Sequence, residues 1–506
     1  MTLARTWSVG LAGVRGAMVE VEVDIAAGLP GVALVGLPDA VVRQSVDRVR
    51  AAIANAKGEF PARRITIGLS PASMPKQGSG FDLALAAAVL AASGTVPRQA
   101  VDRLVLLGEL GLDGSVRAIR GVLPAVLAAA RAGHDHVVVP AANAAEAALV
   151  DRIDVLAVET LTQLVEHLKG ITRLEPQVRG AVPPAPPSPD LGDVVGQAAG
   201  RRAVEVAAAG GHHLYLAGPP GAGKTMLAER LPGLLPALDE QSALEVTAIH
   251  SIAGILPSDA PLITRPTFEA PHHSATMAAL IGGGSGSIRP GALCRAHRGV
   301  LFMDEAPEFP RAVLDTLRQP LERGQVTIQR AAGAATFPCR AQLVLAANPC
   351  PCATAVGDTA CTCSPLERRR YQARLSGPLL DRVDLRVELP PVTRAAWLDG
   401  LPAPESTAVV AARVAGARAA AGERLAGTGL GLNSEVPGRM LRERFAVPRA
   451  SLRLAERALE RGAISVRGFD RVMRVAWTLS DLAGRTVPGS DEVAEALGMR
   501  LQRAAA

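Results

Sequence analysis

The spacing of apolar residues divides the chain into two blocks in which strands and helices alternate, followed by a block of helices alone. In the first block, apolar runs and period-two alternation predict strands at Met18–Ile25, Ala33–Val35, Arg64–Gly68, Leu104–Gly108 and His136–Val139. Helical spacing predicts helices at Ala40–Ala56, Phe81–Ala92, Val122–Ala132 and Leu161–Leu168. This alternation is typical of an α/β domain.

The second block continues the alternation, and the third does not. Short apolar runs predict strands at His213–Leu216, Val300–Phe302 and Leu343–Ala346, at intervals typical of a parallel sheet. From about Val392 onward strand-like runs stop. Helical spacing there predicts four helices, at Thr407–Ala421, Arg449–Arg461, Asp470–Ala483 and Ser490–Ala496. We therefore expect a parallel-sheet domain followed by a helical domain.

A proline-rich segment at residues 182–189 separates the first two blocks. Proline at this density cannot sustain a helix or a central strand, so the segment is expected to be a stiff, extended linker. The predicted organisation is a first domain at residues 1–172, a linker at 173–189, an α/β core at 190–395 and a helical domain at 396–506.

Composition narrows the class of protein. With 506 residues and 48% hydrophobic content, the chain can bury several cores. A net charge of +6 is compatible with an acidic partner such as nucleic acid but does not show one, and 3% aromatics argue against base-stacking platforms. No signal-peptide pattern is seen, and the longest apolar run, Leu83–Ala92, is too short to span a bilayer. We expect a cytoplasmic protein without a membrane partner.

The segment Gly218-Pro219-Pro220-Gly221-Ala222-Gly223-Lys224-Thr225 matches the phosphate-loop pattern in full. An apolar strand, Leu214–Ala217, precedes it and a helical run, Met226–Arg230, follows, which is the context the motif requires. Glycines let backbone N–H groups turn toward phosphate oxygens, and the new helix adds its positive end. Lys224 is expected to bridge the β- and γ-phosphates and Thr225 to hold Mg²⁺, so ATP and Mg²⁺ are the predicted cofactors.

Two further strand ends carry polar residues that suit nucleotide hydrolysis. Val300-Leu301-Phe302-Met303-Asp304-Glu305 is an apolar strand that ends in two acids. Asp304 is expected to complete the Mg²⁺ shell, and Glu305 to orient and deprotonate the attacking water. Asn348 ends the strand Leu343–Ala347 and suits a residue that senses the γ-phosphate, although an Asn that only caps a strand end would look the same.

Two arginines are candidates for phosphate contacts from elsewhere in the chain. Arg382 follows a short helix in an acidic context, and Arg467 stands at the start of a late helix. In a chain whose 54 basic residues are nearly all arginine, the residues alone favour surface ion pairs for both. Only the family resemblance described below favours a role at the nucleotide.

Four of the six cysteines are crowded into one short segment. Asn348-Pro349-Cys350-Pro351-Cys352 is followed by Cys361-Thr362-Cys363, and two Cys-x-Cys pairs can supply four thiolates to one tetrahedral Zn²⁺. Buried or free thiols, or an iron–sulfur cluster, are the alternatives, because Cys-x-Cys is tighter than the usual zinc spacing. Cys294 and Cys339 stand alone and are expected to be core thiols.

These motifs together resemble the YifB/ComM family of magnesium-chelatase-like AAA+ ATPases over nearly the whole chain. Besides the phosphate loop, the acidic strand and the cysteine segment, the shared strings are Val35-Gly36-Leu37-Pro38-Asp39, Ala270-Pro271-His272-His273 and Leu375-Ser376-Gly377-Pro378-Leu379-Leu380-Asp381-Arg382. The resemblance implies an AAA+ core with a helical lid, assembled as a homo-oligomeric ring that we expect to be a hexamer. In such a ring Arg382 resembles the arginine finger and Arg467 the lid's sensor arginine.

The resemblance also implies insertions that face the centre of the ring. Ile252–Arg298 resembles one insertion hairpin, with Arg289, Arg295 and Arg298 expected to contact DNA phosphates, and a second hairpin is expected around Val326–Thr336. His272 and His273 look like a metal pair. Adjacent residues of a strand point to opposite faces, so a structural or pore-loop role is expected instead.

The first block resembles the Lon-protease-like domain, whose proteases use a Ser–Lys dyad. Pro75-Lys76-Gln77-Gly78-Ser79-Gly80 looks like the serine loop, but the nucleophile position falls on Gly80 and Ser79 is displaced by one. The lysine position falls near Leu123, and Arg117–Arg131 contains no lysine. The first domain is therefore expected to be an inactive binding or assembly module.

Three functions follow from the resemblance, and the residues alone leave the choice open. The first is an ATP-driven ring motor on DNA that binds without sequence preference, like the branch-migration helicase role of ComM. The second is a chelatase-type or chaperone-like ATPase that remodels a protein partner. The third, an ATP-dependent protease, is disfavoured by the missing dyad.

Overall fold

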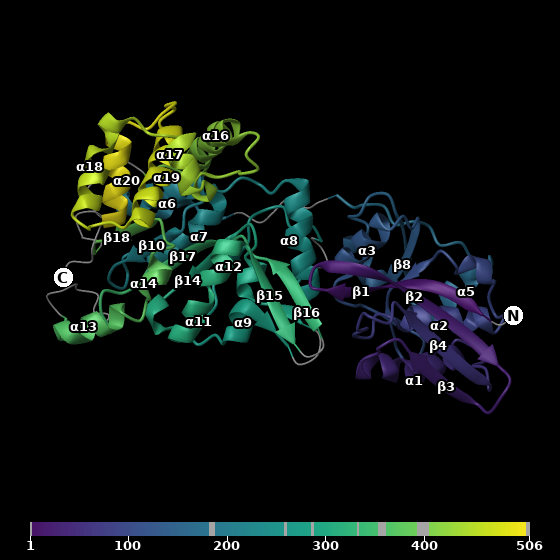
Figure 1. Cartoon of the computed structure of the whole chain (residues 1–506). Helices are drawn as coiled ribbons and strands as arrows, with labels where there is room; N and C mark the ends of the chain where they lie inside the picture. Colours follow the sequence, from purple (N-terminus) through teal and green to yellow (C-terminus); the bar gives the residue numbers. More distant parts are fainter. Residues whose placement is uncertain are drawn as a thin grey trace.

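The computed structural model describes residues 3–181, 188–257, 261–284, 288–330, 333–352, 361–391 and 404–501. Figure 1 shows an elongated molecule, with the N-terminal block at one end and the phosphate-loop sheet and C-terminal helices at the other. Within the described ranges, no helix is both long enough and apolar enough to cross a membrane.

A seven-stranded mixed sheet forms the centre of the N-terminal block, in the order β3-β4-β2-β1-β5-β8-β9. Its strands are β1 (Ala4–Ala12), β2 (Arg15–Ala26), β3 (Gly31–Val35), β4 (Arg64–Ser70), β5 (Val105–Leu106), β8 (His136–Pro140) and β9 (Asp154–Val158), and a small pair, β6 (Glu109–Leu110) and β7 (Val116–Arg117), stands apart. The helices of this block are α1 (Ala40–Asn55), α2 (Asp82–Ala92), α3 (Val122–Arg131), α4 (Ala144–Ala147) and α5 (Leu161–Leu168).

Burial explains why these elements form. In β2, buried valines such as Val19 and Val21 alternate with partly exposed glutamates, which is the pattern of a strand with one solvent-exposed face. Every residue of α2 is buried, so its apolar run is a core helix. Strand β1 was not predicted from the sequence. Its residues Thr6 and Ser8 are buried, and because they are polar the alternation of apolar and polar positions was not apparent. The Thr6 hydroxyl donates to the Leu104 carbonyl at 2.9 Å.

A five-stranded parallel sheet forms the centre of the second block, in the order β11-β14-β17-β10-β18. Its strands are β10 (Leu214–Ala217), β11 (Phe268–Glu269), β14 (Val300–Met303), β17 (Gln342–Ala347) and β18 (Leu385–Glu388). β17 lies between β10 and β14, with Leu216 opposite Ala346 and Phe302 opposite Val344. Because the strands are parallel, the carboxyl ends of β10, β14 and β17 meet at one edge.

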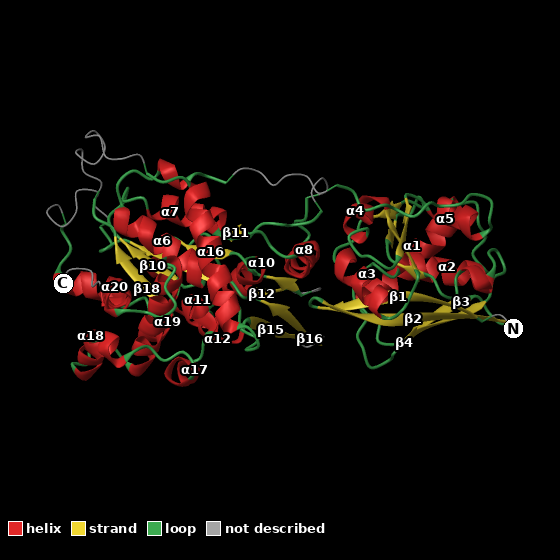
Figure 2. Ribbon diagram, turned by 90° about the horizontal axis from the view of Figure 1, so that it is seen from above, coloured by secondary structure: helices red, strands yellow, loops and turns green. Residues whose placement is uncertain are grey.

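Helices surround this sheet and extend into the C-terminal block (Figure 2). The second block contains α6 (Ala198–Gly210), α7 (Lys224–Leu234), α8 (Glu240–Ala253), α9 (Met277–Ile281), α10 (Ala292–Arg295), α11 (Arg311–Thr316), α12 (Arg318–Arg323), α13 (Pro365–Gln372) and α14 (Gly377–Leu380). The C-terminal block contains α16 (Thr407–Leu425), α17 (Gly438–Glu443), α18 (Arg449–Glu460), α19 (Val466–Leu482) and α20 (Ser490–Leu501). One apolar core joins α16 and α19 to α6 and the sheet, through residues such as Val414, Ala476 and Val204.

The insertions differ from the expectation in one respect. The second expected hairpin is present as β15 (Gln325–Arg330) and β16 (Gly333–Pro338), paired antiparallel. The stretch Ile252–Arg298 does not form one long hairpin in its described residues. It folds as β11, α9, a two-residue pair β12 (Gly282–Gly283) and β13 (Arg289–Pro290), and α10. Gly282 has a φ of 116° and lies so close to β13 that a Cβ there would be 2.5 Å from the Arg289 carbonyl oxygen, so a glycine is required at this position.

The N-terminal block contacts the second block through α8 and the β15–β16 hairpin. Gly13 forms a bridge with Thr336 of β16, and the Gly121 N–H donates to the Ser251 carbonyl at 3.3 Å. The Ser251 hydroxyl also donates to the buried Glu146 carboxylate at 2.6 Å. Burial raises the pKa of Glu146, and hydrogen bonds from Ser251 and Asn143 oppose that rise. The fold is thus mixed α/β with a parallel sheet and a helical C-terminal region, which confirms the predicted fold class.

Candidate nucleotide-binding site

The phosphate loop connects β10 to α7 at the carboxyl edge of the parallel sheet. Gly221 and Gly223 take left-handed φ values of 76° and 84°, which a residue with a Cβ adopts only under strain. Gly218 is required for a different reason, because a Cβ there would lie 2.7 Å from the Leu389 carbonyl oxygen. The loop ends at Lys224, the first residue of α7, so the positive end of the helix points at the phosphate position.

Lys224 is folded back into this loop. Its Nζ donates to the carbonyl oxygens of Gly218 at 2.6 Å and Pro219 at 2.9 Å, and to Oδ1 of Asn348 at 3.0 Å. Burial lowers the pKa of the Lys224 ammonium, while the nearby carboxylates Asp304 and Glu305 raise it. The amine therefore sits at the bottom of the loop, where a phosphate anion would replace neutral carbonyl partners.

The strand order brings the other polar residues to Lys224. Asp304 follows β14 and Asn348 follows β17, and both strands end beside the phosphate loop. The Thr225 hydroxyl donates to Oδ2 of Asp304 at 2.9 Å. A hydroxyl and a carboxylate side by side are hard oxygen donors of the kind that Mg²⁺ prefers, so this pair fits the metal.

Glu305 has an unusual backbone and a partner that the sequence did not indicate. Its φ is 48°, in the left-handed region, and its N–H donates to Oδ1 of Asp304 at 2.8 Å. Its carboxylate Oε2 lies 3.2 Å from Nδ1 of His273. His272 and His273 lie in a turn after β11, with ring centroids 4.0 Å apart. The expectation that they lie on opposite faces of a strand is wrong, because the strand ends at Glu269.

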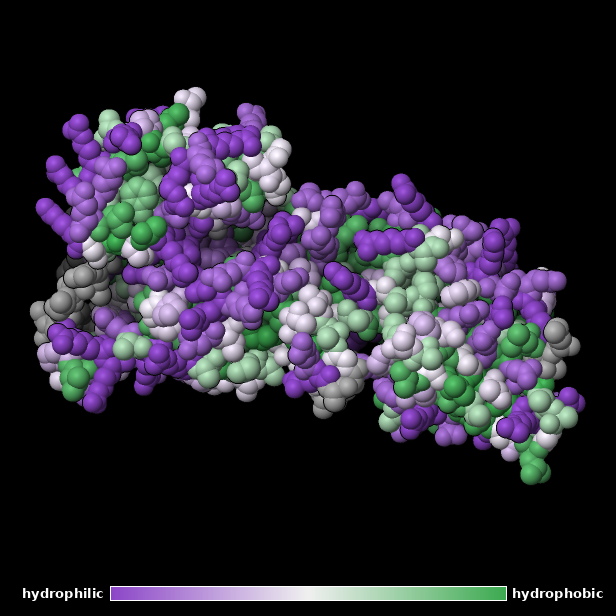
Figure 3. Space-filling model, viewed as in Figure 1, coloured by the Kyte–Doolittle hydropathy of each residue, from purple (hydrophilic) through white to green (hydrophobic). Residues whose placement is uncertain are grey.

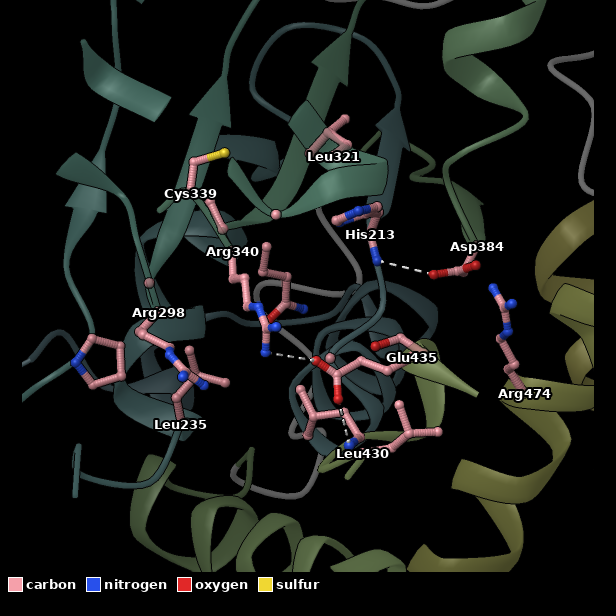
Figure 4. Close-up of a pocket in the computed structure, with 18 of the residues that line it drawn as sticks. His213, Leu235, Arg298, Leu321, Cys339, Arg340, Asp384, Leu430, Glu435 and Arg474 are labelled. Atoms are coloured by element: carbon pink, nitrogen blue, oxygen red, sulfur yellow. Dashed lines mark hydrogen bonds and ion pairs between the residues drawn. The ribbon is translucent and has the colours of Figure 1, made fainter. Parts of the chain in front are cut away.

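Arg382 and Arg467 do not reach this loop. Both line a pocket of about 750 Å³, whose wall includes His213, Gln342 and Asp384 at the amino ends of the strands. Figure 4 shows His213 and Asp384 in this pocket, with Arg474 projecting from the C-terminal helices. The phosphate loop lies at the opposite edge of the same sheet. The structure therefore separates both arginines from the phosphate loop of their own chain.

The pocket, which we call the arginine pocket, is strongly charged. Eight arginines line it, Arg298, Arg323, Arg340, Arg382, Arg418, Arg467, Arg471 and Arg474. One buried carboxylate anchors part of this set, since Asp384 pairs with Arg471 and lies 3.4 Å from Nδ1 of His212. Burial alone would raise the pKa of Asp384, but the hydrogen bond with His212 and the Arg471 charge hold it well below its usual range. The Arg382 guanidinium donates to the Pro378 carbonyl at 2.7 Å and pairs with Glu322, while Arg467 is exposed.

The four clustered cysteines lie beside Asn348. Sγ of Cys350 is 3.1 Å from Sγ of Cys352 and 3.4 Å from that of Cys361. The ligand atoms of these three residues and Cys363 all lie within 4.8 Å of one another. Tetrahedral zinc with bonds of about 2.3 Å places its sulfurs about 3.8 Å apart, so the donor set and its spacing fit Zn²⁺. Cys294 and Cys339 are buried core thiols, as expected, and burial raises the pKa of Cys294 to about 12.

The serine loop of the N-terminal block has structural partners. The Ser79 hydroxyl donates to Glu109, and the buried Lys76 ammonium donates to the Pro71 carbonyl. Burial lowers the pKa of Lys76. Asp39, from the shared string at 35–39, caps α1 and also accepts from the Gly78 N–H at 3.2 Å. Ser79 and Lys76 therefore each have another partner, and the expected lack of a protease dyad stays a prediction.

The insertion arginines have different environments. Arg295 makes a two-pronged ion pair with Glu269, with contacts of 2.7 and 3.1 Å, and Arg298 pairs with Glu245 at 3.6 Å and lines the arginine pocket. Both therefore have partners within their own chain, and the expected phosphate contacts stay a prediction. Arg289 on β13 is exposed, and Arg330 at the tip of β15 is exposed near Gly283. Sequence reasoning missed Arg330, although its place before the hairpin turn was a usable signal.

Family profiles match three stretches of the chain. The profile described as magnesium chelatase, subunit ChlI, matches residues 190–397, and its C-terminal counterpart matches residues 404–500. A third, described as subunit ChlI of Mg-chelatase, matches residues 21–143. The two later matches agree with the parallel sheet and the helices that pack on it.

Similar proteins match this chain over nearly its whole length. An uncharacterized protein of Mycobacterium tuberculosis (strain ATCC 25618 / H37Rv) is 56% identical over 502 residues, 99% of each chain. Competence protein ComM of Haemophilus influenzae is 40% identical over 507 residues, covering 99% of this chain and 98% of its own. Uncharacterized protein YifB of Escherichia coli K12 is 39% identical over 489 residues, covering 96% and 95%.

The resemblance of the N-terminal block to Lon proteases is also found. Lon protease 2 of Bacillus subtilis is 32% identical over 101 residues, 19% of this chain and 18% of its own. The three family profiles and the full-length relatives place the chain in one family. The chain belongs to the YifB/ComM family of magnesium-chelatase-like AAA+ proteins.

Proposed function

We propose that this protein is an ATP-hydrolysing ring motor that acts on DNA, in the manner of a branch-migration helicase. One observation carries the proposal: the groups that bind and hydrolyse ATP lie at one edge of the sheet, and two candidate arginines lie at the other. A chain built this way presents half of an active site on each of two faces. Head-to-tail assembly of such chains closes a ring.

Each residue at the carboxyl edge has a role that follows from its place. Lys224 exchanges its carbonyl partners for the β- and γ-phosphates, and Thr225 and Asp304 hold Mg²⁺, which neutralises phosphate charge when bound. Glu305 accepts a proton from the attacking water. Asn348, which already contacts Lys224, orients that water against the γ-phosphate.

The arginine pocket supplies the second half of the site. Arg382 acts as the finger on the neighbour's nucleotide, and Arg467 contacts the same phosphates from the helical lid. Arginine fingers of this kind raise hydrolysis about 10³–10⁵-fold. A homohexamer is the ring we propose.

The N-terminal block is proposed as an assembly module. β3 is an edge strand, and hydrophobic residues gather on the face near it and α1 in Figure 3. Leu29, Val35 and Leu37 are 89%, 58% and 57% exposed, with no charged residue between Leu29 and Leu37. An uncharged edge with exposed apolar side chains favours pairing with a second copy of the chain.

DNA is the proposed substrate because of the exposed arginines and the sequence similarity to ComM. Arg289 of β13 and Arg330 of β15 are both exposed and both lie beside Gly283, and a relative over the whole length is named a competence protein. Phosphate contacts carry no sequence information, so binding is expected to be sequence-indifferent and to weaken steeply with salt. A motor of this kind works where ATP and DNA occur together, in the cytoplasm.

The deciding experiment measures ATP hydrolysis by the full chain with and without four-way-junction DNA, together with the size of the assembly. DNA-stimulated hydrolysis and ATP-dependent movement of junction arms support the proposal. If DNA neither binds the ATP-loaded ring at low salt nor changes its hydrolysis rate, the DNA role fails. A chelatase-type or chaperone-like ATPase acting on a protein partner then becomes the better explanation.

The cysteine cluster is proposed to bind one structural Zn²⁺ through Cys350, Cys352, Cys361 and Cys363. Four thiolates leave no open position, so the metal would not take part in hydrolysis. Its place two residues after Asn348 suggests that it stiffens the end of β17.

A further inference from the structure

The two edges of the N-terminal sheet differ. At one edge, the segment after α5 covers β9: the Gln177 N–H donates to the Val155 carbonyl at 2.8 Å, and Pro176 forms an antiparallel bridge with Leu156. At the other edge, β3 pairs with β4 and ends the strand order of the sheet. Among the described residues, the outer side of β3 therefore has no strand partner.

We propose that β3 pairs with β3 of a second copy of the chain about a two-fold axis, and that this contact joins the chains of two rings. The inference rests on the proposed role of the N-terminal block in assembly, and it specifies which surfaces meet and in what register. Figure 1 shows β3 at the end of the molecule away from the phosphate-loop sheet, so a second chain can reach it without meeting that sheet.

The edge lacks the features that normally prevent strand pairing. No charged residue occurs between Asp24 and Asp39, whereas exposed edges are commonly protected by charged side chains. Pro30 has no N–H to donate, but it precedes the first residue of β3. The alternate residues of β3 that begin at Gly31 are exposed and those between them are partly buried, so the strand presents an uncharged outer face.

The backbone of β3 has hydrogen-bonding groups available for a partner. The Gly31 N–H donates to the Arg63 carbonyl at 3.2 Å, so Gly31 faces the inner side of the strand pair. Because backbone groups of successive residues point to opposite sides, those of Val32 and Leu34 point away from β4. In an antiparallel pair of two β3 strands, Val32 of each copy can exchange both of its hydrogen bonds with Leu34 of the other.

This register makes the edge complementary to itself. Ala33 lies opposite Ala33 of the second copy, and Gly31 lies opposite Val35. Leu29 and Leu37, which are 89% and 57% exposed, stand four residues before and after Ala33, so each is brought toward the other in the second copy. The pairing thus covers the most exposed leucines at both ends of the strand and removes apolar surface from water.

Symmetry separates this contact from the contacts within a ring. A pair of identical edges is related by a two-fold axis, whereas neighbours in a closed ring meet head to tail through two different surfaces. A head-to-tail pairing of β3 with β9 would serve a ring, but the segment at Pro176 and Gln177 already occupies the β9 edge. The β3 contact therefore adds a second level of assembly, between rings.

The first test measures the mass of the full chain by light scattering, in ATP and Mg²⁺, for wild type, Ala33→Lys and Ala33→Glu. Wild type should have about twice the mass of either variant, because like charges would face each other across the two-fold axis. An equal mixture of the two variants should regain the larger mass, since opposite charges then meet. Thr66→Lys is the matched control, because Thr66 lies beside Ala33 on β4, one strand away from the edge, and should keep the wild-type mass.

The second test reads the register directly. In this pairing the Cα atoms of the two Ala33 residues would be about 4.5 Å apart, within the range that a disulfide spans. Ala33→Cys should therefore form a covalent dimer on mild oxidation, and wild type, with its six native cysteines, should not. Val35→Cys should form one only when it is mixed with Gly31→Cys.

Three outcomes overturn the inference. If Ala33→Lys has the wild-type mass, β3 is not a contact. If Ala33→Lys breaks the ring into single chains, β3 pairs within a ring. If Ala33→Cys does not cross-link to itself, the two-fold register is wrong. Because Ala33 is remote from the phosphate loop, each Ala33→Lys chain should hydrolyse ATP as wild type does. A wild type that forms the β3 contact but neither hydrolyses ATP nor binds DNA would refute the proposed function and leave this inference intact.

Discussion

Replacing Arg382 by alanine should abolish hydrolysis and leave nucleotide binding intact. Arg382 lies in the arginine pocket at the amino ends of the strands, and the phosphate loop lies at the carboxyl ends. The side chain therefore cannot contact the nucleotide of its own chain. If it completes the neighbour's site, Arg382→Ala acts on turnover alone.

Arg382→Ala should affect the stability of the chain far less than it affects the rate of hydrolysis. Within its own chain Arg382 pairs with Glu322, whose side chain is 59% exposed, and such a pair contributes at most about 1 kcal/mol to stability. Loss of a finger costs about 10³–10⁵ in rate, or about 4–7 kcal/mol of barrier. The melting temperature of Arg382→Ala should therefore lie close to that of wild type, while its rate of ATP hydrolysis should be far lower. Glu322→Gln is the matched control, because it removes the ion pair and keeps the finger.

The assay is a mixing experiment. Arg382→Ala chains keep the phosphate loop, and Lys224→Ala chains keep the finger. In rings mixed at random in equal amounts, about one interface in four combines the two intact halves, so about a quarter of wild-type hydrolysis should return if neighbouring sites fire independently. Either variant alone should remain inactive.

Two results would refute this reasoning. If Arg382→Ala alone hydrolyses ATP at a rate within threefold of wild type, Arg382 is not the finger. If it loses nucleotide binding together with hydrolysis, the residue acts on its own chain's site, contrary to the separation of the two edges.

Four further outcomes are expected. Glu305→Gln should bind ATP with Mg²⁺ and hydrolyse it at less than about one hundredth of the wild-type rate, since the metal ligands stay in place while the base is gone; wild-type turnover would contradict this. Protein purified without added zinc should contain about one zinc per chain by metal analysis, and a Cys350→Ser, Cys352→Ser double variant should contain none. Casein incubated with the protein, ATP and Mg²⁺ should remain uncut. If casein is cleaved and Ser79→Ala abolishes the cleavage, the protease hypothesis is supported instead. The raised pKa of Glu146 favours the neutral acid in the fold, so its contribution to stability should be present at low pH and lost as pH rises through that pKa; the melting temperature of Glu146→Gln should therefore rise relative to wild type as the pH is raised above the ordinary glutamate pKa.

The sequence predicted the local parts of the site because each is a short motif. Lys224, Asp304 and Asn348 each follow an apolar run of buried parallel strand, and such strands leave their polar ends at one edge. Four helices of the C-terminal block were equally visible, although α19 begins at Val466 rather than Asp470 and α16 continues to Leu425, and the short α17 was not predicted. Their apolar positions pack into the same core as α6, so helical spacing was preserved.

Contacts between distant segments could not be predicted. β1 was missed because Thr6 and Ser8 are buried where apolar residues would normally mark a strand. The approach of His273 to Glu305 depends on β11 pairing with β14, which no local pattern encodes. Arg295 was expected at DNA because of its charge and its place in the segment that resembles a pore-facing insertion, and its partner Glu269 became apparent only when β11 and α10 were brought together.

The short sheet bears directly on the proposed ring assembly. β10 has four residues and spans about 13 Å, with the phosphate loop after its last residue and the arginine pocket before its first. Arg467 is fixed at the start of α19, and α19 packs into the shared core, so it cannot swing around the sheet without unpacking that core. If both arginines act at a nucleotide, as we propose, hydrolysis requires a second chain whose pocket meets the first chain's loop. The N-terminal block contacts the β15–β16 hairpin through Gly13, and the same hairpin contacts β12 through Ile328. The N-terminal block and β12 of the insertion segment therefore both contact the same hairpin.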